Sequence, residues 1–159
     1  HNVPVLLNPA PAQKLDDEFL GMVTYLTPNE TESEILTGIP VIDLISAKKA
    51  AKKLVARGPK CVVITLAEKG AVLATKDTFI HVPGFPVTPV DTVAAGDAFN
   101  GAFALAIAQA LPLKNVLRIA NAVGALTVSR EGAIPSLPTK EEVEAFMAKH
   151  SEPEGSCAR

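Results

Sequence analysis

The residues best suited to chemistry are Gly96 and Asp97, which stand at the start of a predicted helix from Ala98 to Ala110. Almost every residue of this helix is small or apolar, so we expect it to be buried nearly all round. A helix N-terminus offers unpaired N–H donors and partial positive charge. Because Ala94, Ala95 and Gly96 have little or no side chain, a ligand can approach this backbone closely. The stretch predicts an anion site with a carboxylate at its lip.

Two roles are open for Asp97 at this position. An Asp at the start of a helix commonly caps it, and an isolated Gly-Asp pair would favour that interpretation. A phosphoryl-transfer site, in contrast, needs donors for the phosphate charge and a base that accepts the proton of the attacking hydroxyl. Asp97 beside the backbone N–H groups of Ala94, Ala95 and Gly96 could supply both functions.

Asn29 and Glu32 form a second pair of interest, within the run T-P-N-E-T-E. Thr27 as N-cap and Glu30 three residues later predict a capping box for a helix that runs to about Leu36. This assignment leaves Asn29 and Glu32 on one helix face near the N-terminus. Their oxygens could hold waters around a phosphate-bound Mg²⁺. A solvated surface pair is equally compatible with the sequence.

Three further positions combine polar or flexible residues with a suggestive location. The loop Thr65–Gly70 follows a predicted central strand, and ligands bind at the carboxyl ends of strands in open α/β sheets. It is also compatible with a plain loop that turns at Gly70. Asp91 lies six residues before Asp97, too far to share a helix face, and a loop Asp commonly bonds nearby backbone N–H groups. Asn121 is a mildly unfavourable polar residue inside an apolar predicted helix.

The elements that must position these residues alternate along the chain. Apolar runs predict three strands and then an antiparallel hairpin, at Val3–Leu7, Val23–Leu26, Cys61–Leu66, and the pair Ala71–Thr75 and Thr78–Val82. Further helices are predicted at residues 16–22, 28–36, 43–57, 113–129 and 139–150, the last with a Thr139–Glu142 capping box. This order predicts a layered α/β domain over residues 1–150, with a largely parallel sheet, and a frayed tail at 151–159.

Composition narrows the function classes. A chain of 159 residues fits one domain, and although 48% of it is apolar, no uninterrupted apolar run could span a bilayer. The net charge of −2 gives no support to nucleic-acid binding. Cys61 and Cys157 make neither a metal site nor a disulfide framework, and no signal peptide is visible, so we expect a reduced, cytoplasmic setting. The chain opens at His1 without an initiator Met, which suggests a fragment or processed chain.

The stretch from Asp91 to Ala102, D-T-V-A-A-G-D-A-F-N-G-A, resembles the second signature of the ribokinase family, the phosphofructokinase-B-type carbohydrate kinases. Residues 8–12, N-P-A-P-A, and 26–32, L-T-P-N-E-T-E, are similar to further ribokinase patterns. The resemblance implies an α-β-α ribokinase-like domain that phosphorylates a sugar primary hydroxyl with ATP, most readily D-ribose to ribose 5-phosphate. Asp97 would be the base, and the N–H groups of Ala94, Ala95, Gly96 and Asp97 would stabilise the developing charge.

The same resemblance implies where ATP and Mg²⁺ would bind. Asn29 and Glu32 match the family's motif for phosphate and metal, and Asn121 matches a position that lines the adenine pocket. The nucleotide loop corresponds to Thr65, Leu66, Ala67, Glu68, Lys69 and Gly70. Ala67 stands where the family usually has Gly. Cofactor contacts are also expected at Gly96 and Asp97.

A monovalent cation, K⁺, is a further implication of the resemblance. In ribokinases the residue that matches Asp91 binds this cation together with backbone carbonyls. The remaining matching positions are Val93, Thr127, Arg130, Gly132 and Ser136. Most would contribute carbonyl oxygens, so their side-chain identity tests the assignment only weakly.

The resemblance covers nearly all of residues 1–150 but only the C-terminal half of a family member. The N-terminal half, which carries the β-rich lid and most sugar-binding residues, is expected to be missing. The lid usually mediates homodimerisation in this family. Two other functions stay open: another sugar or nucleoside kinase of the same family, and a non-catalytic nucleotide-binding fragment.

Overall fold

A mixed five-stranded sheet forms the centre of the protein in the computed structural model, which describes residues 3–150. The strands follow one another in chain order: β1 (Leu6–Leu7), β2 (Tyr25–Leu26), β3 (Cys61–Thr65), β4 (Ala71–Ala74) and β5 (Phe79–Val82). The β1–β2 and β2–β3 pairings are parallel, whereas β3–β4 and β4–β5 are antiparallel. The predicted hairpin is therefore confirmed, and β3 also pairs with it in the antiparallel sense.

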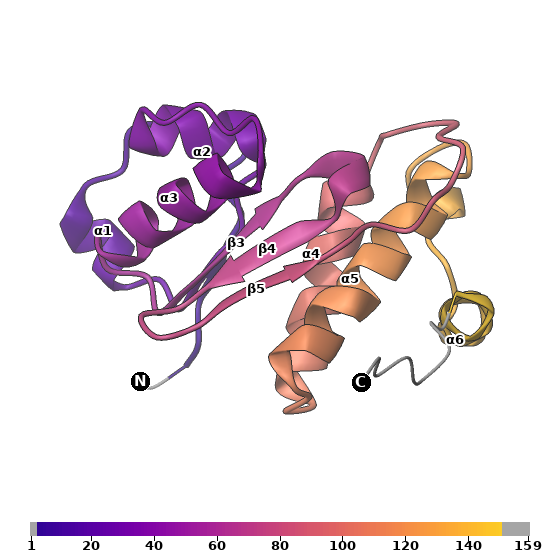
Figure 1. The fold of residues 1–159 in the computed structure, drawn as a ribbon. Coiled ribbons are helices and arrows are strands. Elements are labelled where there is room, and N and C mark those ends of the chain that lie inside the picture. The colour runs from indigo at the N-terminus through magenta and orange to yellow at the C-terminus, as the bar shows by residue number, and fades with distance from the viewer. Residues whose placement is uncertain (1–2, 151–159) are drawn as a thin grey trace, which may run out of the picture.

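Helices cover both faces of this sheet, as Figure 1 shows. One layer contains α1 (Asp17–Gly21), α2 (Glu30–Thr37) and α3 (Leu44–Val55), and the other contains α4 (Ala95–Ala108) and α5 (Leu113–Val128). Helix α6 (Lys140–Lys149) packs on α5, and two short 3₁₀ turns, η1 (Ala67–Lys69) and η2 (Ile134–Ser136), complete the fold. The predicted layered α/β architecture is confirmed.

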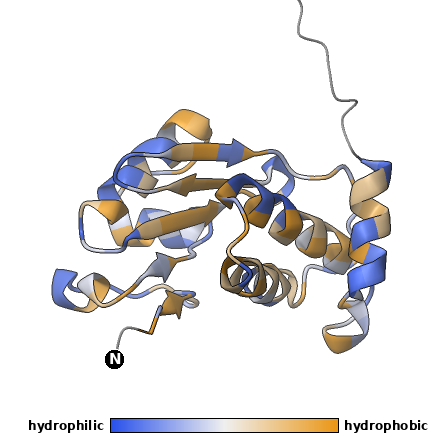
Figure 2. Ribbon diagram, turned by 90° about the horizontal axis from the view of Figure 1, so that it is seen from below, coloured by the Kyte–Doolittle hydropathy of each residue, from blue (hydrophilic) through white to orange (hydrophobic). Residues whose placement is uncertain are grey.

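Side-chain alternation along β3 divides the core in two. Val62 and Ile64 belong to the cluster beneath α1–α3, whereas Cys61 and Val63 belong to the cluster beneath α4 and α5. Figure 2 shows hydrophobic residues concentrated along the strands and the helices that pack on them. Burial raises the pKa of the Cys61 thiol to about 12, so this cysteine stays protonated and is a packing residue.

The first two strands are shorter than the apolar runs predicted. Leu6 and Leu7 make up β1, because Pro4 has no N–H for a ladder and the Val5 N–H donates to Thr24 Oγ1 at 3.1 Å. The sheet is nevertheless continuous, since β1 pairs with β2 and β2 with the central strand β3. Within the described part of the chain, β1 has β2 as its only partner.

The prediction that α4 is buried nearly all round is wrong. Ala98, Phe99, Phe103 and Ala106 are buried against the sheet and α5, but Leu105 is 62% exposed on the opposite face. Gly101, Ala104 and Ala108 are exposed as well. An apolar helix is buried only where something packs on it, and no element within residues 3–150 covers this face.

Two expectations concern membranes and the C-terminal tail. The described residues contain no helix long and apolar enough to cross a bilayer. The predicted tail, 151–159, lies outside the described residues.

Candidate functional site

Asn29 and Glu32 make the capping box of α2, so the predicted box of Thr27 and Glu30 is wrong. Asn29 Oδ1 accepts from the Glu32 N–H, and Glu32 Oε2 accepts from the Asn29 N–H, both at 2.8 Å. Thr27 cannot serve as N-cap because it still follows the strand, where its N–H donates to the Leu7 carbonyl at 2.9 Å. Capping uses one oxygen of each side chain. The Asn29 amide nitrogen and Glu32 Oε1 have no partner among the described residues.

The start of α2 lies directly beside the end of β3. The Thr65 N–H donates to the Pro28 carbonyl at 3.1 Å, and Asn29 and Thr65 form an isolated parallel bridge. The structure thus brings the predicted metal and phosphate pair next to the predicted nucleotide loop, at the carboxyl end of a central strand.

The loop Thr65–Gly70 has a tightly constrained backbone. Its ends are closed by the Leu66 N–H, which donates to the Gly70 carbonyl at 2.8 Å. Gly70 has φ +91°, and a Cβ there would overlap the Val82 carbonyl oxygen. Ala67 adopts φ +49°, the left-handed region that favours glycine, so the residue that departs from the family pattern keeps the glycine-like conformation.

Lys69, which belongs to the same loop, is held on the side of α3. Its ammonium group lies 3.4 Å from the Ile42 carbonyl oxygen, and its own carbonyl lies 3.0 Å from His81 Nε2. The lysine side chain therefore braces the loop in this structure.

Asn121 connects α5 to the segment 82–84, which contacts the Thr65–Gly70 loop. The side chain is 7% exposed, and its amide nitrogen donates to the carbonyls of Val82 at 3.0 Å and Pro83 at 3.2 Å. A Cβ on Gly84 would overlap the Glu68 carbonyl oxygen, so the segment lies against the predicted nucleotide loop. These bonds explain a polar residue in an apolar helix.

Helix α4 begins without a side-chain cap. Its N-cap is Ala94, in the left-handed conformation at φ 62°, and no side chain bonds the first turn. Asp97 is the third helical residue and is exposed, so the interpretation of Asp97 as the cap is wrong. The N–H groups of Gly96 and Asp97 have no acceptor among residues 3–150. The site therefore offers free donors and a free carboxylate in one helical turn.

Asp91 ties the loop before α4 to the loop after α5. Its Oδ1 accepts from the Val93 N–H at 2.9 Å, and its Oδ2 accepts from the Gly132 N–H at 3.0 Å. The Val93 bond first, and then the Gly132 bond, hold the pKa of Asp91 below its usual value. The group is therefore a carboxylate at neutral pH, and the tie weakens only when the pH falls through this lowered pKa.

The other predicted cation ligands have side chains engaged elsewhere. Thr127 Oγ1 donates to the Val123 carbonyl at 2.8 Å, and Ser136 Oγ donates to the Ala133 carbonyl at 2.6 Å. The Arg130 guanidinium makes two bonds to the Glu142 carboxylate of α6, at 3.2 and 2.7 Å. No cluster of three or more His, Cys, Asp or Glu in the described chain could hold a metal. Besides the Asp91 carboxylate, these positions can therefore offer backbone carbonyls as cation ligands.

The predicted site residues form local groups at one end of the sheet. Figure 1 shows the η1 turn, the connection before α4 and the loop after α5 at the upper end of the view. Gly124 of α5 lies by the Ala95 carbonyl, so the two helices meet at the start of α4. No hydrogen bond or ion pair within residues 3–150 joins Asp97 to Asn29 or Glu32.

Two parts of this region escaped the sequence prediction. The buried Asn100 Oδ1, one turn after Gly96, has no hydrogen-bond partner in the described structure. In the sequence, Asn100 could have been noticed as a polar residue within an apolar helix. The second part is the segment from Val82 to Gly84, which contacts both Asn121 and the nucleotide loop. Its Pro-Gly pair indicates a turn but carries no sign of this contact.

Comparison with known proteins identifies the family. A family model for pfkB family carbohydrate kinases matches residues 1–140. The chain belongs to this family. The match includes the Asp91–Ala102 stretch at the start of α4 and extends over both helical layers of the fold.

Ribokinases are prominent among the relatives of this pfkB-family chain. It is 44% identical over 147 residues to a ribokinase of Haemophilus influenzae, covering 92% of this chain and 48% of the relative. It is 40% identical over 149 residues to a deoxyribokinase of Salmonella typhimurium, covering 93% and 49%. The chain spans about half the length of the curated relatives it matches.

Solved structures agree with this assignment. A ribokinase of Thermotoga maritima matches with a TM-score of 0.83 and 41% identity, over 93% of this chain and 50% of that protein. A ribokinase of Arabidopsis thaliana, solved with ribose and ATP, matches with a TM-score of 0.86 and 34% identity, over 91% and 47%. The prediction of a ribokinase-like fold is confirmed.

The backbone of Ala67 generates a stability prediction. Replacing Ala67 by Gly should raise the free energy of unfolding by about 0.5–1 kcal/mol, because glycine has no Cβ to clash at positive φ. Ala56→Gly is the matched control: Ala56 has φ −65°, so the added flexibility should lower the free energy of unfolding by about 0.5–1 kcal/mol. Urea denaturation measures both. Equal losses in the two variants would show that Ala67 is unstrained.

Proposed function

We propose that this chain is the nucleotide-binding and catalytic part of a sugar kinase that transfers the γ-phosphoryl group of ATP to a primary hydroxyl. D-ribose is the first candidate substrate. The observation that carries the proposal is the start of α4, where the Gly96 and Asp97 N–H groups have no acceptor among residues 3–150 and lie beside the exposed Asp97 carboxylate. The similarity to the Haemophilus influenzae ribokinase supports the choice of reaction.

In this proposal Asp97 accepts the proton of the attacking sugar hydroxyl. The carboxylate has no partner among the described residues, so its lone pairs are free to receive that proton. The Gly96 and Asp97 N–H groups and the positive end of α4 would stabilise the negative charge that develops on the transferred group. The nucleotide supplies the phosphoryl group. Ala94 and Ala95 keep this end of the helix open because their side chains are small.

Mg²⁺ fits the unused carboxylate oxygen at the start of α2, whereas the Asn29 amide nitrogen is a donor that suits a phosphate oxygen. Glu32 Oε1 and the Asn29 amide nitrogen have no partner in the part of the chain that the structure describes. One carboxylate oxygen can hold waters of a Mg²⁺ that is bound mainly by phosphates, because Mg²⁺ prefers oxygen ligands and keeps several waters. A putative ribokinase II of E. coli, similar to this chain with a TM-score of 0.73 and 28% identity, was solved with ATP and Mg²⁺.

K⁺ is proposed for the two loops that Asp91 joins. The carboxylate brings Val93 and Gly132 together. The family resemblance adds the carbonyls of Thr127, Arg130 and Ser136, of which that of Thr127 also accepts from the Arg130 N–H at 3.2 Å. An anionic group among carbonyl oxygens suits a weakly hydrated monovalent cation. Phosphofructokinase-2 of E. coli, similar with a TM-score of 0.75 and 27% identity, was solved with potassium.

The sugar substrate has more than one candidate. Deoxyribose is the second candidate, because a Salmonella typhimurium deoxyribokinase is 40% identical to this chain. Another sugar or a nucleoside is the broader alternative, and nucleotide binding without catalysis is the non-enzymatic one. A homodimer formed through a lid remains a prediction from the family resemblance, and a cytoplasmic location remains a prediction from the cysteine content and the opening residues of the sequence.

The role of Asp97 can be tested in a chimera in which this chain replaces the matching half of the Haemophilus influenzae ribokinase. The chimera should phosphorylate ribose with ATP. Asp97→Asn should lower turnover at least about 100-fold, because the amide cannot accept the proton, while nucleotide binding persists. Asp77→Asn is the matched control, since Asp77 is exposed in the β4–β5 turn, and it should leave turnover unchanged. A coupled ADP-release assay and calorimetry measure the two quantities.

One outcome would contradict the kinase proposal, and another would contradict the assignment of Asp97. A folded chimera that binds ATP and ribose but transfers no phosphoryl group would refute the kinase proposal for this chain. A fall in turnover of less than tenfold in Asp97→Asn would show that the carboxylate is not the base.

The cation proposal makes a separate prediction in the same chimera. Replacing K⁺ by tetramethylammonium at constant ionic strength should lower turnover severalfold, because the large ion cannot enter a site lined by carbonyls. Asp91→Ala should lower turnover in K⁺ and remove the difference between the two salts. Equal rates in both salts for the unsubstituted chimera would remove K⁺ from the account.

A further inference from the structure

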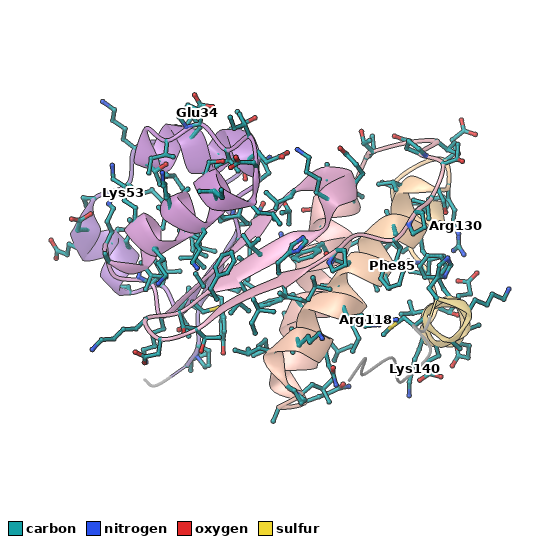
Figure 3. The ribbon with its side chains drawn as sticks, in the orientation of Figure 1. Glu34, Lys53, Phe85, Arg118, Arg130 and Lys140 are labelled. Carbon is teal, nitrogen blue, oxygen red and sulfur yellow. The ribbon has the colours of Figure 1, made fainter. Side chains whose placement is uncertain are left out.

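Phe85 directly follows the segment that lies against the nucleotide loop, and it is packed by residues from two helices. Its ring centre lies 5.1 Å from that of Phe146 and 5.6 Å from that of His150 at the end of α6. The Arg118 guanidinium of α5 lies over the same ring at 5.4 Å. Figure 3 shows Phe85 and Arg118 between α5 and α6.

Helix α6 is fastened at both ends, so its aromatic residues are held in place. At its start, Glu142 binds the Arg130 guanidinium, with 2.7 Å between Glu142 Oε1 and Arg130 Nη2. At its end, Arg118 donates to the His150 carbonyl at 2.8 Å, and His150 Nδ1 lies 2.9 Å from the Phe146 carbonyl. The same arginine therefore contacts both the end of α6 and the Phe85 ring.

These contacts continue to the nucleotide loop through a short stretch of backbone. Asn121, one turn after Arg118 on α5, holds the Val82 and Pro83 carbonyls. Gly84 lies against the Glu68 carbonyl, and Gly70 lies against that of Val82. The segment, Arg118 and His150 together line a pocket of about 250 Å³, and the ring of Phe85 links the segment to α6 through its contact with Phe146.

We propose that Phe146 is a positioning residue for the nucleotide site. Through its contact with Phe85 it fixes the segment 82–85, and the Thr65–Gly70 loop packs against this segment. The expected effect on nucleotide binding rests on the proposed function, whereas the structural link between Phe146 and the segment 82–85 does not. Phe146 lies in none of the segments that the family resemblance assigns to ATP. Its substitution weakens nucleotide binding because the bound nucleotide must then order a segment that α6 otherwise holds.

The test compares this chain with three variants. Phe146→Leu removes the ring but keeps an apolar side chain, so α6 remains folded. Phe146→Tyr keeps the ring, at a position that is half-buried, and therefore retains the contact with Phe85. Val143→Ala is the matched control, because Val143 is 9% exposed on the same helix and makes no ring contact with Phe85. Circular dichroism confirms that each variant is folded.

Two measurements are made on each variant. NMR relaxation should show the backbone order parameters of Gly84 and Phe85 falling from about 0.85 toward about 0.6 in Phe146→Leu. Calorimetry with ADP and Mg²⁺ should show a dissociation constant raised about three- to tenfold, the range expected for loss of an aromatic pair. Phe146→Tyr and Val143→Ala should match the original chain in both measurements.

The outcomes separate this inference from the proposed function. If the original chain binds no ADP, the proposed function fails, and the order parameters alone decide the link between α6 and the segment. Unchanged order parameters in Phe146→Leu, or an unchanged dissociation constant where the original chain does bind, would overturn the inference. If α6 detaches in Phe146→Leu, Phe85→Leu removes the same contact from the other side and is judged by the same two results.

Discussion

The start of α4 is the feature on which the rest of the account depends, because its exposed N–H groups at Gly96 and Asp97 have no acceptor within residues 3–150 and are open to a ligand. Ala94 in the left-handed conformation gives this end no side-chain cap, and Gly96 and Asp97 keep free donors. The neighbouring loop is fixed independently by the bonds from Asp91 to Val93 and Gly132. The open helix end is therefore held in a defined position by interactions that leave its donors free.

Two further contacts place the remaining segments at the same end of the sheet. The Thr65–Pro28 bond holds α2 beside β3, and the Asn121 amide holds the end of β5 against the loop Thr65–Gly70. Each contact is a side chain or N–H bonded to a backbone carbonyl, which fixes the path of a loop without requiring a large core. The exposed face of α4 and the unpaired edge of β1 within the described residues show, in contrast, that packing on the sheet and its helices is incomplete.

Most of this organisation could be predicted from local patterns. The hairpin at residues 71–82 and the Thr139 capping box follow from short-range chemistry, and both are present. The sequence contains two overlapping capping patterns, Thr27 with Glu30 and Asn29 with Glu32. It could not show which of them is used, because that depends on where the strand before α2 ends. The exposure of Leu105 was equally inaccessible, since periodicity records the polarity of a face but not what covers it. Asp97 does not cap α4 because the helix begins earlier, after Ala94 in the left-handed conformation, and no residue pattern predicts that conformation for an alanine.

The most direct test of the central claim is whether phosphate groups bind the open end of α4. In ¹⁵N-labelled chain titrated with a non-hydrolysable ATP analogue and Mg²⁺, the Gly96 and Asp97 amide resonances should shift in a saturable way, because their N–H groups donate to the phosphates. The amide of Gly101, farther along the same helix, should move much less. A folded chain whose Gly96 and Asp97 resonances stay in place at millimolar nucleotide would contradict the account.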